Sequence, residues 1–520
     1  MEIRYAILAS EETVCQAHWR SVEQLQALGG VACAAIIQAG EQPALPFRAG
    51  SAAGCRPVDL RAQLPALRRV DVASASELSL DFILNCTFLS PGRPLIEAAA
   101  HGVWMFFYGN PTREGAWPPA WGEIDRGELL THITLSRLSD PAVVLGECVI
   151  PTDRTSYRTN LQNALIAGID LPANALKNLR AGRAQCVSLP AELPPSRVQL
   201  SFVRKARFLA GMARSWAVVQ IRSMFVSEDW NVGIVEAPIA RFLDPAFRPD
   251  VTWLPRYHGR ARFIADPFAV PSNNGLTVLV EEFDNNRYQG FLSSIDWAPG
   301  TAVPPARVMI DEGIHMSYPF PVKHGGELFL MPETQVRREV ALYRRDSTGV
   351  WRRAHQLISD FAALDATAVR FDGRWWLFCG SQDELPECKL YVFYSDDLFG
   401  PWIPHPMNPV KCDARSSRPG GTPFEVDGKL YRPAQDASHG YGGALTINLV
   451  KILTPEEFEE EAVCSIGPIA GSLYNDGLHT LSTAGGGRTL IDGKRLVFTP
   501  ERIPRRVLHK LRRLGQVLFR

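Results

Sequence analysis

The stretch ADPFAVPSNNGLTVLVEEF, residues 265–283, decides the fold, because a short apolar strand leads through a turn at Gly275 into a second apolar strand. Four similar phrases follow, beginning at Ser317, Asp365, Arg418 and Leu478. Their starts lie roughly 50 residues apart, the period at which one repeat is a four-stranded sheet and the array is a β-propeller. The chain therefore predicts an all-β five-bladed propeller, in which strand ends from every blade meet at one mouth.

Length and composition limit the number of domains, the partners and the location that can be expected. With 520 residues the chain is too long for one hydrophobic core and predicts more than one domain. Lys plus Arg equals Asp plus Glu at 55 each, so we expect no nucleic acid as a partner. The ten cysteines show neither a CxxC pair nor metal-ligand spacing, which predicts a reducing compartment, no metal and no cofactor. Without a signal-like start or a long apolar run, the expected location is the cytoplasm.

Residues 1–190 follow a different pattern, in which apolar strands alternate with helices. This alternation predicts an α/β domain with a largely parallel sheet covered on both faces. A dinucleotide site has no support, because no GxGxxG follows the first strand. The expected strands are 3–8, 31–37, 80–85 and 103–108, and the expected helices are 15–28 and 93–101.

Two basic amphipathic segments flank the predicted propeller, which we place at residues 229–498. Residues 191–228 combine a Pro-rich linker with a helix in which apolar and basic residues interleave, and residues 499–520 form a tail of similar character. Such segments are typical either of a helix docked between domains or of a peripheral contact with an anionic membrane surface, such as an inner membrane. Both interpretations stay open here.

Acidic side chains recur at matched positions of the repeats. Asp266 and Asp365 open the first and third copies, while Glu282 and Glu333 each stand sixteen residues after a repeat start. Paired carboxylates across a sugar supply the acid and the base that glycosidic chemistry needs. We therefore predict Asp266, Glu333 and Asp365 as catalytic residues and Glu282 as a substrate contact. Turn caps and solvated hairpin ends are the structural alternative.

Basic, aromatic and amide side chains accompany these acids near the repeat starts. An arginine at a channel mouth presents a rigid fork suited to phosphate or carboxylate, so a carbohydrate or sugar-phosphate substrate is expected. The scattered histidines do not offer zinc spacing, and no G-x-S-x-G elbow occurs. The further predicted substrate-binding residues are His315, Tyr318, Arg418, Arg432, Gln435, Asp436 and Tyr441.

The repeats resemble the five-bladed propellers of glycoside hydrolase families 43 and 32, through the phrases ADPF and DATAVRFDGRWWLF. More closely, residues 231–461 are similar to the N-terminal domain of the plant glucosamine inositolphosphorylceramide transferases and their bacterial counterparts. The phrases HMSYPF, LFLMPET, FGPWIPHPMNPV, SRPGG and LYRPAQD carry that resemblance in order. In the plant family the propeller accompanies a separate transferase domain.

The hydrolase resemblance implies that Asp266 is the base or nucleophile and that Asp365 tunes its partner. The pattern departs at Arg418, where a fourth-blade glutamate would be the acid, and Glu333 is our hypothesis for a substitute. An arginine there suits a donor with a good leaving group, such as a sugar nucleotide or sugar phosphate. We therefore place glycosyl transfer, in surface polysaccharide or glycolipid assembly, ahead of glycoside hydrolysis. A non-catalytic glycan-binding module is the third interpretation.

The N-terminal part resembles a formyltransferase domain of the methionyl-tRNA formyltransferase type, through DFILNCTF, HGVWMFFYGN and WGEIDRGELLTHITLSRLSD. The resemblance places the catalytic Asn and His of that family near Met105 and Phe107, and its aspartate at Asp140. Neither apolar side chain can carry a proton or polarise a formyl group. We therefore expect a degenerate scaffold, and formyl transfer to a sugar nucleotide is the least favoured function.

Overall fold

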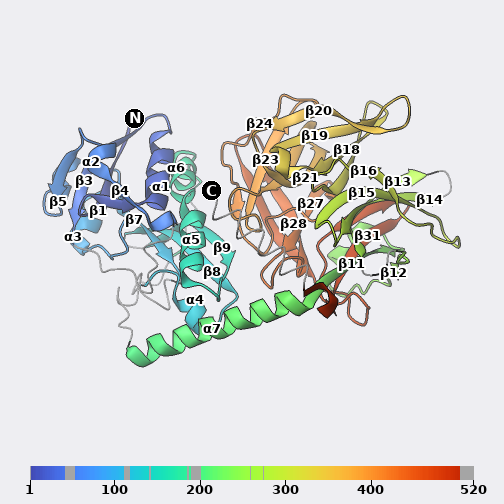
Figure 1. Ribbon diagram of the computed structural model, residues 1–520. Helices are drawn as coiled ribbons and strands as arrows, with labels where there is room; N and C mark the ends of the chain where they lie inside the picture. The colour runs from blue at the N-terminus through green and yellow to red at the C-terminus, as the bar shows by residue number, and fades with distance from the viewer. Residues whose placement is uncertain are drawn as a thin grey trace. The chain divides into compact units, whose positions relative to one another are not determined.

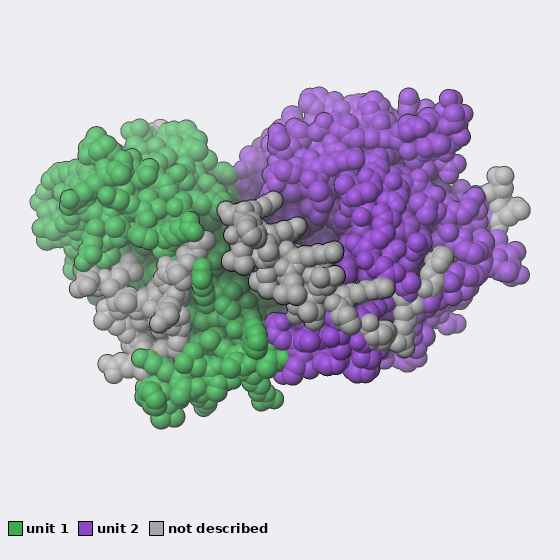
Figure 2. All heavy atoms as spheres, in the orientation of Figure 1, with its two compact units in different colours: residues 1–217 green, residues 218–520 purple. Residues whose placement is uncertain are grey.

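The computed structural model describes residues 2–40, 53–110, 118–139, 142–183, 187–188, 201–257, 259, 261–272 and 275–503. The chain forms two compact units, unit 1 at residues 1–217 and unit 2 at residues 218–520 (Figure 2). No helix among the described residues combines the length and the hydropathy that a transmembrane helix needs.

Unit 1 is built on a mixed β-sheet, and the expectation of a largely parallel sheet was wrong. Strands β5, β3, β1, β6 and β7 are parallel, but β8, β9 and β10 continue the sheet antiparallel. Only residues 139–142 separate β8 from β9, and so short a connection cannot carry a parallel crossover. The strands are β1 (Ile3–Ser10), β2 (Thr13–Cys15), β3 (Val31–Ala39), β4 (Pro57–Asp59), β5 (Arg68–Asp71), β6 (Phe82–Asn85), β7 (Val103–Tyr108), β8 (Leu130–Leu138), β9 (Val143–Pro151) and β10 (Val187–Ser188).

Helices pack on this sheet through apolar positions, as the sequence pattern indicated for α1, whose Trp19, Val22 and Leu25 are buried. The helix expected to reach His101 ends instead at Ile96, because the backbone amides of Ala100 and His101 bond to carbonyls at the start of the β6 segment. The helices are α1 (Gln16–Gln26), α2 (Leu60–Gln63), α3 (Arg93–Ile96), α4 (Gly122–Arg126), α5 (Tyr157–Gly168) and α6 (Leu171–Arg180).

The described part of unit 2 contains five antiparallel sheets, which confirms the five-bladed propeller (Figure 1). Each predicted repeat supplies the inner strands of one blade. Blades 1 and 2 consist of β13 (Arg262–Ser272), β14 (Gly275–Asp284), β15 (Gln289–Trp297) and β16 (Arg307–Ile310), and of β17 (Ser317–His324), β18 (Glu327–Glu333), β19 (Glu339–Arg345) and β20 (Trp351–Ser359).

Blades 3 and 4 follow in chain order, and blade 5 closes the ring with strands from both ends of unit 2. Blade 3 is β21 (Ala363–Phe371), β22 (Arg374–Ser381), β23 (Lys389–Ser395), β24 (Ile403–Pro404) and β25 (Lys411–Cys412). Blade 4 is β26 (Phe424–Val426), β27 (Lys429–Asp436), β28 (Ala444–Leu453) and β29 (Phe458–Ile466). Blade 5 joins β11 (Val226–Val235) and β12 (Thr252–Trp253) to β30 (Leu481–Gly485) and β31 (Arg488–Phe498).

The inner strands of blades 1 to 3 share a bulge near the mouth of the propeller. Asp266, Tyr318 and Asp365 adopt φ values of 50°, 49° and 50°, each where the pairing with the next strand shifts its register. Left-handed backbone is uncommon for residues other than glycine and is typical of functional or tightly constrained positions. The three residues are therefore equivalent, and the true counterpart of Asp266 in blade 2 is Tyr318.

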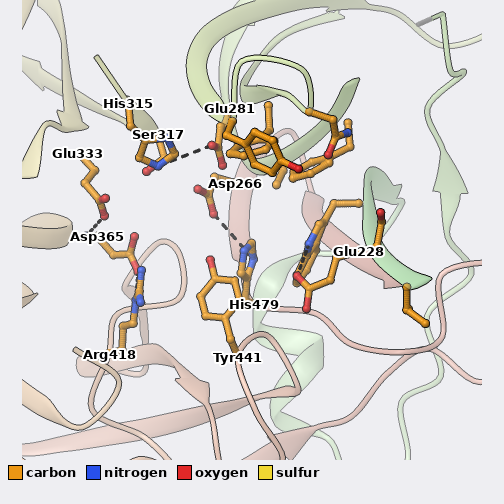
Figure 3. A pocket seen from close by; sticks show the side chains of 18 of the residues that line it. Glu228, Asp266, Glu281, His315, Ser317, Glu333, Asp365, Arg418, Tyr441 and His479 are labelled. Carbon is orange, nitrogen blue, oxygen red and sulfur yellow. Dashed lines mark hydrogen bonds and ion pairs between the residues drawn. The ribbon is translucent and has the colours of Figure 1, made fainter. Parts of the chain in front are cut away.

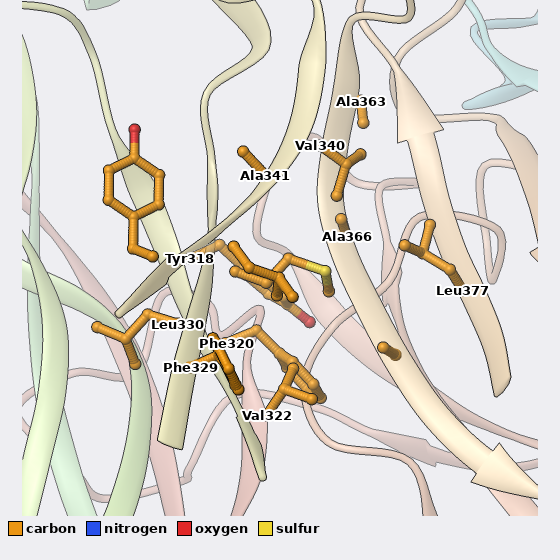
Figure 4. Packing of buried hydrophobic residues seen from close by; sticks show 14 of the residues in the cluster. Tyr318, Phe320, Val322, Phe329, Leu330, Val340, Ala341, Ala363, Ala366 and Leu377 are labelled. Atoms are coloured by element: carbon orange, nitrogen blue, oxygen red, sulfur yellow. The ribbon is translucent and has the colours of Figure 1, made fainter. Parts of the chain in front are cut away.

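A continuous apolar core fixes the blades against one another (Figure 4). Tyr318, Phe320, Leu330, Val340 and Leu377, from blades 2 and 3, are each at most 5% exposed. Consecutive residues such as Val340, Ala341 and Leu342 all belong to this core, because successive side chains point to opposite faces of a sheet that is buried on both faces. Because the bulged residues lie beside the core, the packing holds the acidic side chains at the mouth in place.

Helix α7 (Phe202–Phe225) is one uninterrupted helix of 24 residues (Figure 1). It lies within the predicted segment 191–228, and the division between unit 1 and unit 2 falls inside it. Residues 191–200 of that segment and residues 504–520 of the predicted basic tail lie outside the described residues.

Candidate functional site

A pocket of about 540 Å³ opens in unit 2 where the five blades meet (Figure 3). It brings together six of the residues predicted from the sequence, which come from blades 1 to 4 and from the segment before β17. These are Asp266, His315, Glu333, Asp365, Arg418 and Tyr441. Residues up to 175 positions apart in the sequence thus share one cavity, as the propeller topology requires.

Asp266 is held at the bulge of β13 and is 5% exposed. One carboxylate oxygen accepts a hydrogen bond from the backbone N–H of Tyr318 at 3.3 Å, and the other accepts one from the Thr480 hydroxyl at 3.0 Å. Burial raises the pKa of Asp266 to about 6, although the nearby His479 cation opposes the rise. The group is thus ionised at neutral pH and lies close enough to its pKa to accept a proton.

Glu333 ends strand β18, lines the same pocket and is 6% exposed. Its Oε2 accepts a hydrogen bond from the backbone N–H of Asp365 at 3.1 Å, which fixes the carboxyl group. Burial raises the pKa of Glu333 to about 8, and the Asp365 carboxylate adds to the rise. Glu333 therefore carries a proton at neutral pH, in contrast to Asp266.

Two hydrogen-bond donors fix the carboxylate of Asp365. Arg418 Nε lies 2.6 Å and Gln435 Nε2 lies 2.7 Å from the same oxygen, Oδ2. Arg418 also pairs with Glu387 at 3.1 Å, so two carboxylates offset its charge. The arginine that the sequence suggested for a phosphate group is thus largely committed to holding Asp365.

Sequence reasoning missed a buried ion pair from blade 5 beside Asp266. Nδ1 of His479 lies 2.5 Å from Asp492 Oδ2 and 3.8 Å from Asp266 Oδ1. Burial alone would lower the pKa of His479, but the Asp492 and Asp266 carboxylates raise it to about 9. The phrase LHTLSTAGGGRTLIDGK contains both residues, so extending the comparison of repeats to the fifth copy could have found them.

The same three side chains are the candidate metal ligands of this site. Asp266, His479 and Asp492 each offer a ligand atom, and these atoms lie within 4.8 Å of one another. A histidine must be neutral to ligate a metal, whereas this one is held protonated by its carboxylate partners. A divalent cation bound there would have to displace the proton of His479.

Glu281, and not the predicted Glu282, lines the pocket. Glu281 pairs with Ala265 as Glu333 pairs with Ser317, so the repeats match one residue earlier than the sequence comparison assumed. A slip of one residue turns a strand side chain to the other face of the sheet. Glu282 accordingly faces away from the pocket and bonds to Arg262 at 3.1 Å and Ser293 at 2.8 Å.

The Glu281 carboxyl group is an unusual feature of the pocket wall. The residue is 7% exposed, and its Oε1 lies 3.9 Å from His315 Nε2 but has no hydrogen-bond partner among the described residues (Figure 3). Burial, together with the nearby acidic groups of Asp266, Glu333 and Asp365, raises the pKa of Glu281 well above its usual range. A buried polar atom without a partner is costly, so a ligand hydroxyl or amine would satisfy it.

The other predicted binding residues divide into two groups. His315 and Tyr441 line the pocket: His315 Nδ1 accepts the backbone N–H of Gly290 at 2.9 Å, and the Tyr441 ring lies 5.3 Å from the Arg418 guanidinium carbon. Burial lowers the pKa of His315, which favours the neutral imidazole. Both can contact a ligand without adding charge.

Tyr318, Arg432, Gln435 and Asp436 do not line the pocket, and their contacts are internal. The Tyr318 hydroxyl accepts the backbone N–H of Gly421 at 2.8 Å, and Arg432 pairs with Glu460 at 2.6 Å. Gln435 donates a hydrogen bond to Asp365, while Asp436 caps a turn by accepting the Ser438 N–H at 2.9 Å. These four side chains therefore serve the structure of the propeller, because their polar groups bond to other residues of unit 2.

In unit 1, the two positions expected for formyl-transfer residues carry buried apolar side chains. Met105 is 0% and Phe107 is 3% exposed, and both belong to the core beneath the sheet. Asp140 lies outside the described residues. Unit 1 therefore shows no acid-base group at the first two positions.

The fold and the pocket together define a class, a five-bladed propeller with an acid-lined central pocket. Residues 255–467 match the family described as "Glucosamine inositolphosphorylceramide transferase 1, N-terminal". The transferase of that name from Oryza sativa subsp. japonica is 32% identical over 211 residues, 39% of this chain and 28% of the rice protein. The Arabidopsis thaliana transferase is 31% identical over 211 residues, 39% of this chain and 27% of the plant protein. The chain thus spans less than a third of the length of these curated relatives.

Solved structures give weaker similarities. A family 117 glycoside hydrolase from Zobellia galactanivorans has a TM-score of 0.32 at 12% identity and covers 54% of this chain and 92% of its own. A GH62 α-L-arabinofuranosidase from Coprinopsis cinerea has a TM-score of 0.34 at 12% identity, with coverage of 48% and 95%. A glycinamide ribonucleotide transformylase from Symbiobacterium toebii has a TM-score of 0.27 at 14% identity, with coverage of 35% and 89%.

Proposed function

We propose that unit 2 is a carbohydrate-active domain that breaks a glycosidic bond and transfers the glycosyl group to a hydroxyl acceptor. The observation that carries the proposal is the pair of carboxyl groups in one pocket, Glu333 protonated and Asp266 ionised at neutral pH. When their surroundings give two carboxyl groups different pKa values, the group with the higher pKa can act as the acid and the other as the base or charge stabiliser.

In this proposal Glu333 donates its proton to the departing glycosidic oxygen as the bond to the anomeric carbon breaks. Asp266 stabilises the positive charge that develops on the sugar ring, or accepts the proton of the incoming hydroxyl. Asp365, fixed by Arg418 and Gln435, keeps Glu333 oriented through its backbone N–H and keeps it protonated through its charge. A pocket of about 540 Å³ is within the size range of small-molecule sites.

The electrostatics of the pocket favour a glycoside as the donor over a sugar nucleotide. Arg418 is already paired with Asp365 and Glu387, so it offers little net charge to a phosphate group. Five acidic residues line the pocket against two arginines, Arg418 and Arg502, and an excess of carboxyl groups suits sugar hydroxyls or an amino sugar better than a diphosphate. A poor alkoxide leaving group, in turn, needs the proton that Glu333 holds.

Transfer is preferred to hydrolysis because residues 255–467 match a family that carries the name of a transferase. The same carboxyl pair would also serve hydrolysis if water replaced the hydroxyl acceptor, so hydrolysis is the second candidate. Unit 1 takes no part in the proposal, since Met105 and Phe107 provide no acid or base.

The pH dependence of turnover tests the proposal. Asp266, with a pKa of about 6, must be ionised and Glu333, with a pKa of about 8, must be protonated, so the rate should fall below about 6 and above about 8. The full chain would be assayed on a panel of aryl and alkyl glycosides, including 2-amino-2-deoxyglucosides, with and without alcohol acceptors. New glycosides indicate transfer and free sugar indicates hydrolysis. Ligand binding without any product would identify a glycan-binding module and contradict the proposal.

Replacement of Glu281 by glutamine tests the substrate contact. The amide keeps the shape of the group but changes its donor and acceptor pattern, so we expect kcat/KM to fall about tenfold, equivalent to one hydrogen bond of about 1.4 kcal/mol. Glu282→Gln is the matched control, because this neighbouring buried glutamate faces away from the pocket. Kinetics of both variants on the same glycoside should separate them, and equal losses would argue against a contact from Glu281.

A further inference from the structure

Helix α7 carries an exposed apolar face in its first four turns. Phe202, Leu209 and Trp216 follow at a spacing of seven residues, which places them on one side of the helix. They are 84%, 47% and 56% exposed, and the adjoining Val203 is 75% exposed. Between them lie Ala206, Ala210 and Ala213, so the face contains no charged side chain.

The opposite side of the helix already has its partners within unit 1. Phe208 is 3% exposed and packs against the rings of Trp121 and Tyr157, with centroids at 5.6 and 6.2 Å. Arg204 pairs with Asp125 at 3.0 Å and lies over the Trp121 ring. Docking of α7 on unit 1 therefore does not explain the apolar face, which points away from these contacts.

Basic side chains border the apolar face. The helix contains five Lys or Arg residues and no Asp or Glu. At 100° per residue, Arg207 and Arg214 lie along one edge of the face and Lys205 along the other. None of these three forms an ion pair with an acidic side chain of the described residues. A second copy of the helix would bring like charges together, whereas an anionic surface would neutralise them.

We propose that α7 binds a lipid bilayer with anionic headgroups, lying in the plane of the interface. Phe202, Leu209 and Trp216 would enter the boundary between headgroups and acyl chains, while Arg207 and Arg214 would contact lipid phosphates. An apolar face bordered by cations is the pattern of interfacial helices, and aromatic side chains favour this depth. The inference does not depend on the chemistry of the unit 2 pocket.

Flotation of the full-length protein with vesicles tests this inference. Wild type should bind vesicles of phosphatidylcholine with phosphatidylglycerol, bind phosphatidylcholine alone weakly, and dissociate as salt rises. Arg207→Glu/Arg214→Glu should lower the partition constant on anionic vesicles at least about tenfold. Leu209→Ser/Trp216→Ser, which changes exposed side chains only, should lower binding to a similar degree. Circular dichroism would verify that both variants keep their fold.

The matched control is Arg370→Glu/Lys429→Glu, an equal change of charge at exposed positions of unit 2. Its binding should stay close to wild type after allowance for net charge. The inference is overturned if wild type does not bind anionic vesicles, or if the control loses as much binding as the α7 variants. It is also overturned if sedimentation shows a dimer that Leu209→Ser/Trp216→Ser dissociates, since the face would then be a protein interface.

Discussion

Replacement of Glu333 by glutamine is expected to lower turnover on alkyl glycosides by about 10²–10⁴-fold, the usual contribution of a general acid. The amide oxygen can still accept the backbone N–H of Asp365, so the fold and the pocket should persist. What disappears is the transferable proton, which the buried carboxyl group holds because its pKa is raised to about 8. Steady-state kinetics of the variant measure this loss.

Substrates with different leaving groups distinguish a general acid from a residue with only a structural role. A 4-nitrophenolate departs without protonation, so Glu333→Gln should retain far more activity on 4-nitrophenyl glycosides than on alkyl glycosides. Its pH profile should also lose the decline above about 8, because no proton remains to be removed. A loss of equal size on both classes of glycoside would contradict the role of Glu333 as acid.

Replacement of Glu460 by glutamine is expected to destabilise unit 2 by about 3–5 kcal/mol, which is the cost of removing one charged partner from a buried ion pair. Glu460 and Arg432 are each 1% exposed at their side chains and lie 2.6 Å apart, and Lys411 lies 2.8 Å from the same carboxylate. These two cations hold the pKa of Glu460 below its usual range, although burial alone would raise it. The variant would leave the buried Arg432 and the partly buried Lys411 without this counter-charge.

Hydrogen exchange of peptides from β27 to β29 in increasing urea would measure this loss in blade 4. The neighbouring Glu459→Gln is the matched control, because Glu459 is 40% exposed and makes only a 3.3 Å surface pair with Lys451. We expect a change within about 0.5 kcal/mol for that control. If Glu460→Gln behaved like Glu459→Gln, the triad would contribute nothing to stability.

The propeller could be predicted because its information is local and repeated. Each copy has two apolar strands around a tight turn, and five copies at a regular spacing specify five sheets. The sheet of unit 1 lacks such repetition. Its first strands follow the βαβ pattern, but the direction of β8 and β9 depends on the length of the connection at residues 139–142. That feature is visible only once both strands have been located.

The sequence could predict where the site lies, but only some of the residues that form it. Asp266 and Asp365 were found because they open repeats, whereas the choice between Glu281 and Glu282 depends on matching Asp266 with Tyr318 and not with Ser317, which the sequence does not show. Arg432 is a residue of the type that binds anionic ligands, yet its partner Glu460 lies 28 residues later on an outer strand. Sequence alone does not reveal such pairs, because any arginine can face a ligand or a carboxylate.

Closure of the ring by blade 5 makes the pocket dependent on both ends of unit 2. Trp230 of β11 and His479, just before β30, line the same cavity, and β11 pairs with β31 along its whole length. Residues 255–467, the segment that matches the plant transferase family, contain neither β11 nor β30 and β31. Expressed by itself, that segment would be an open array of four blades, with the apolar faces of blades 1 and 4 uncovered and the cavity incomplete. During synthesis, likewise, the pocket can form only after the ribosome has released β31, at residue 498.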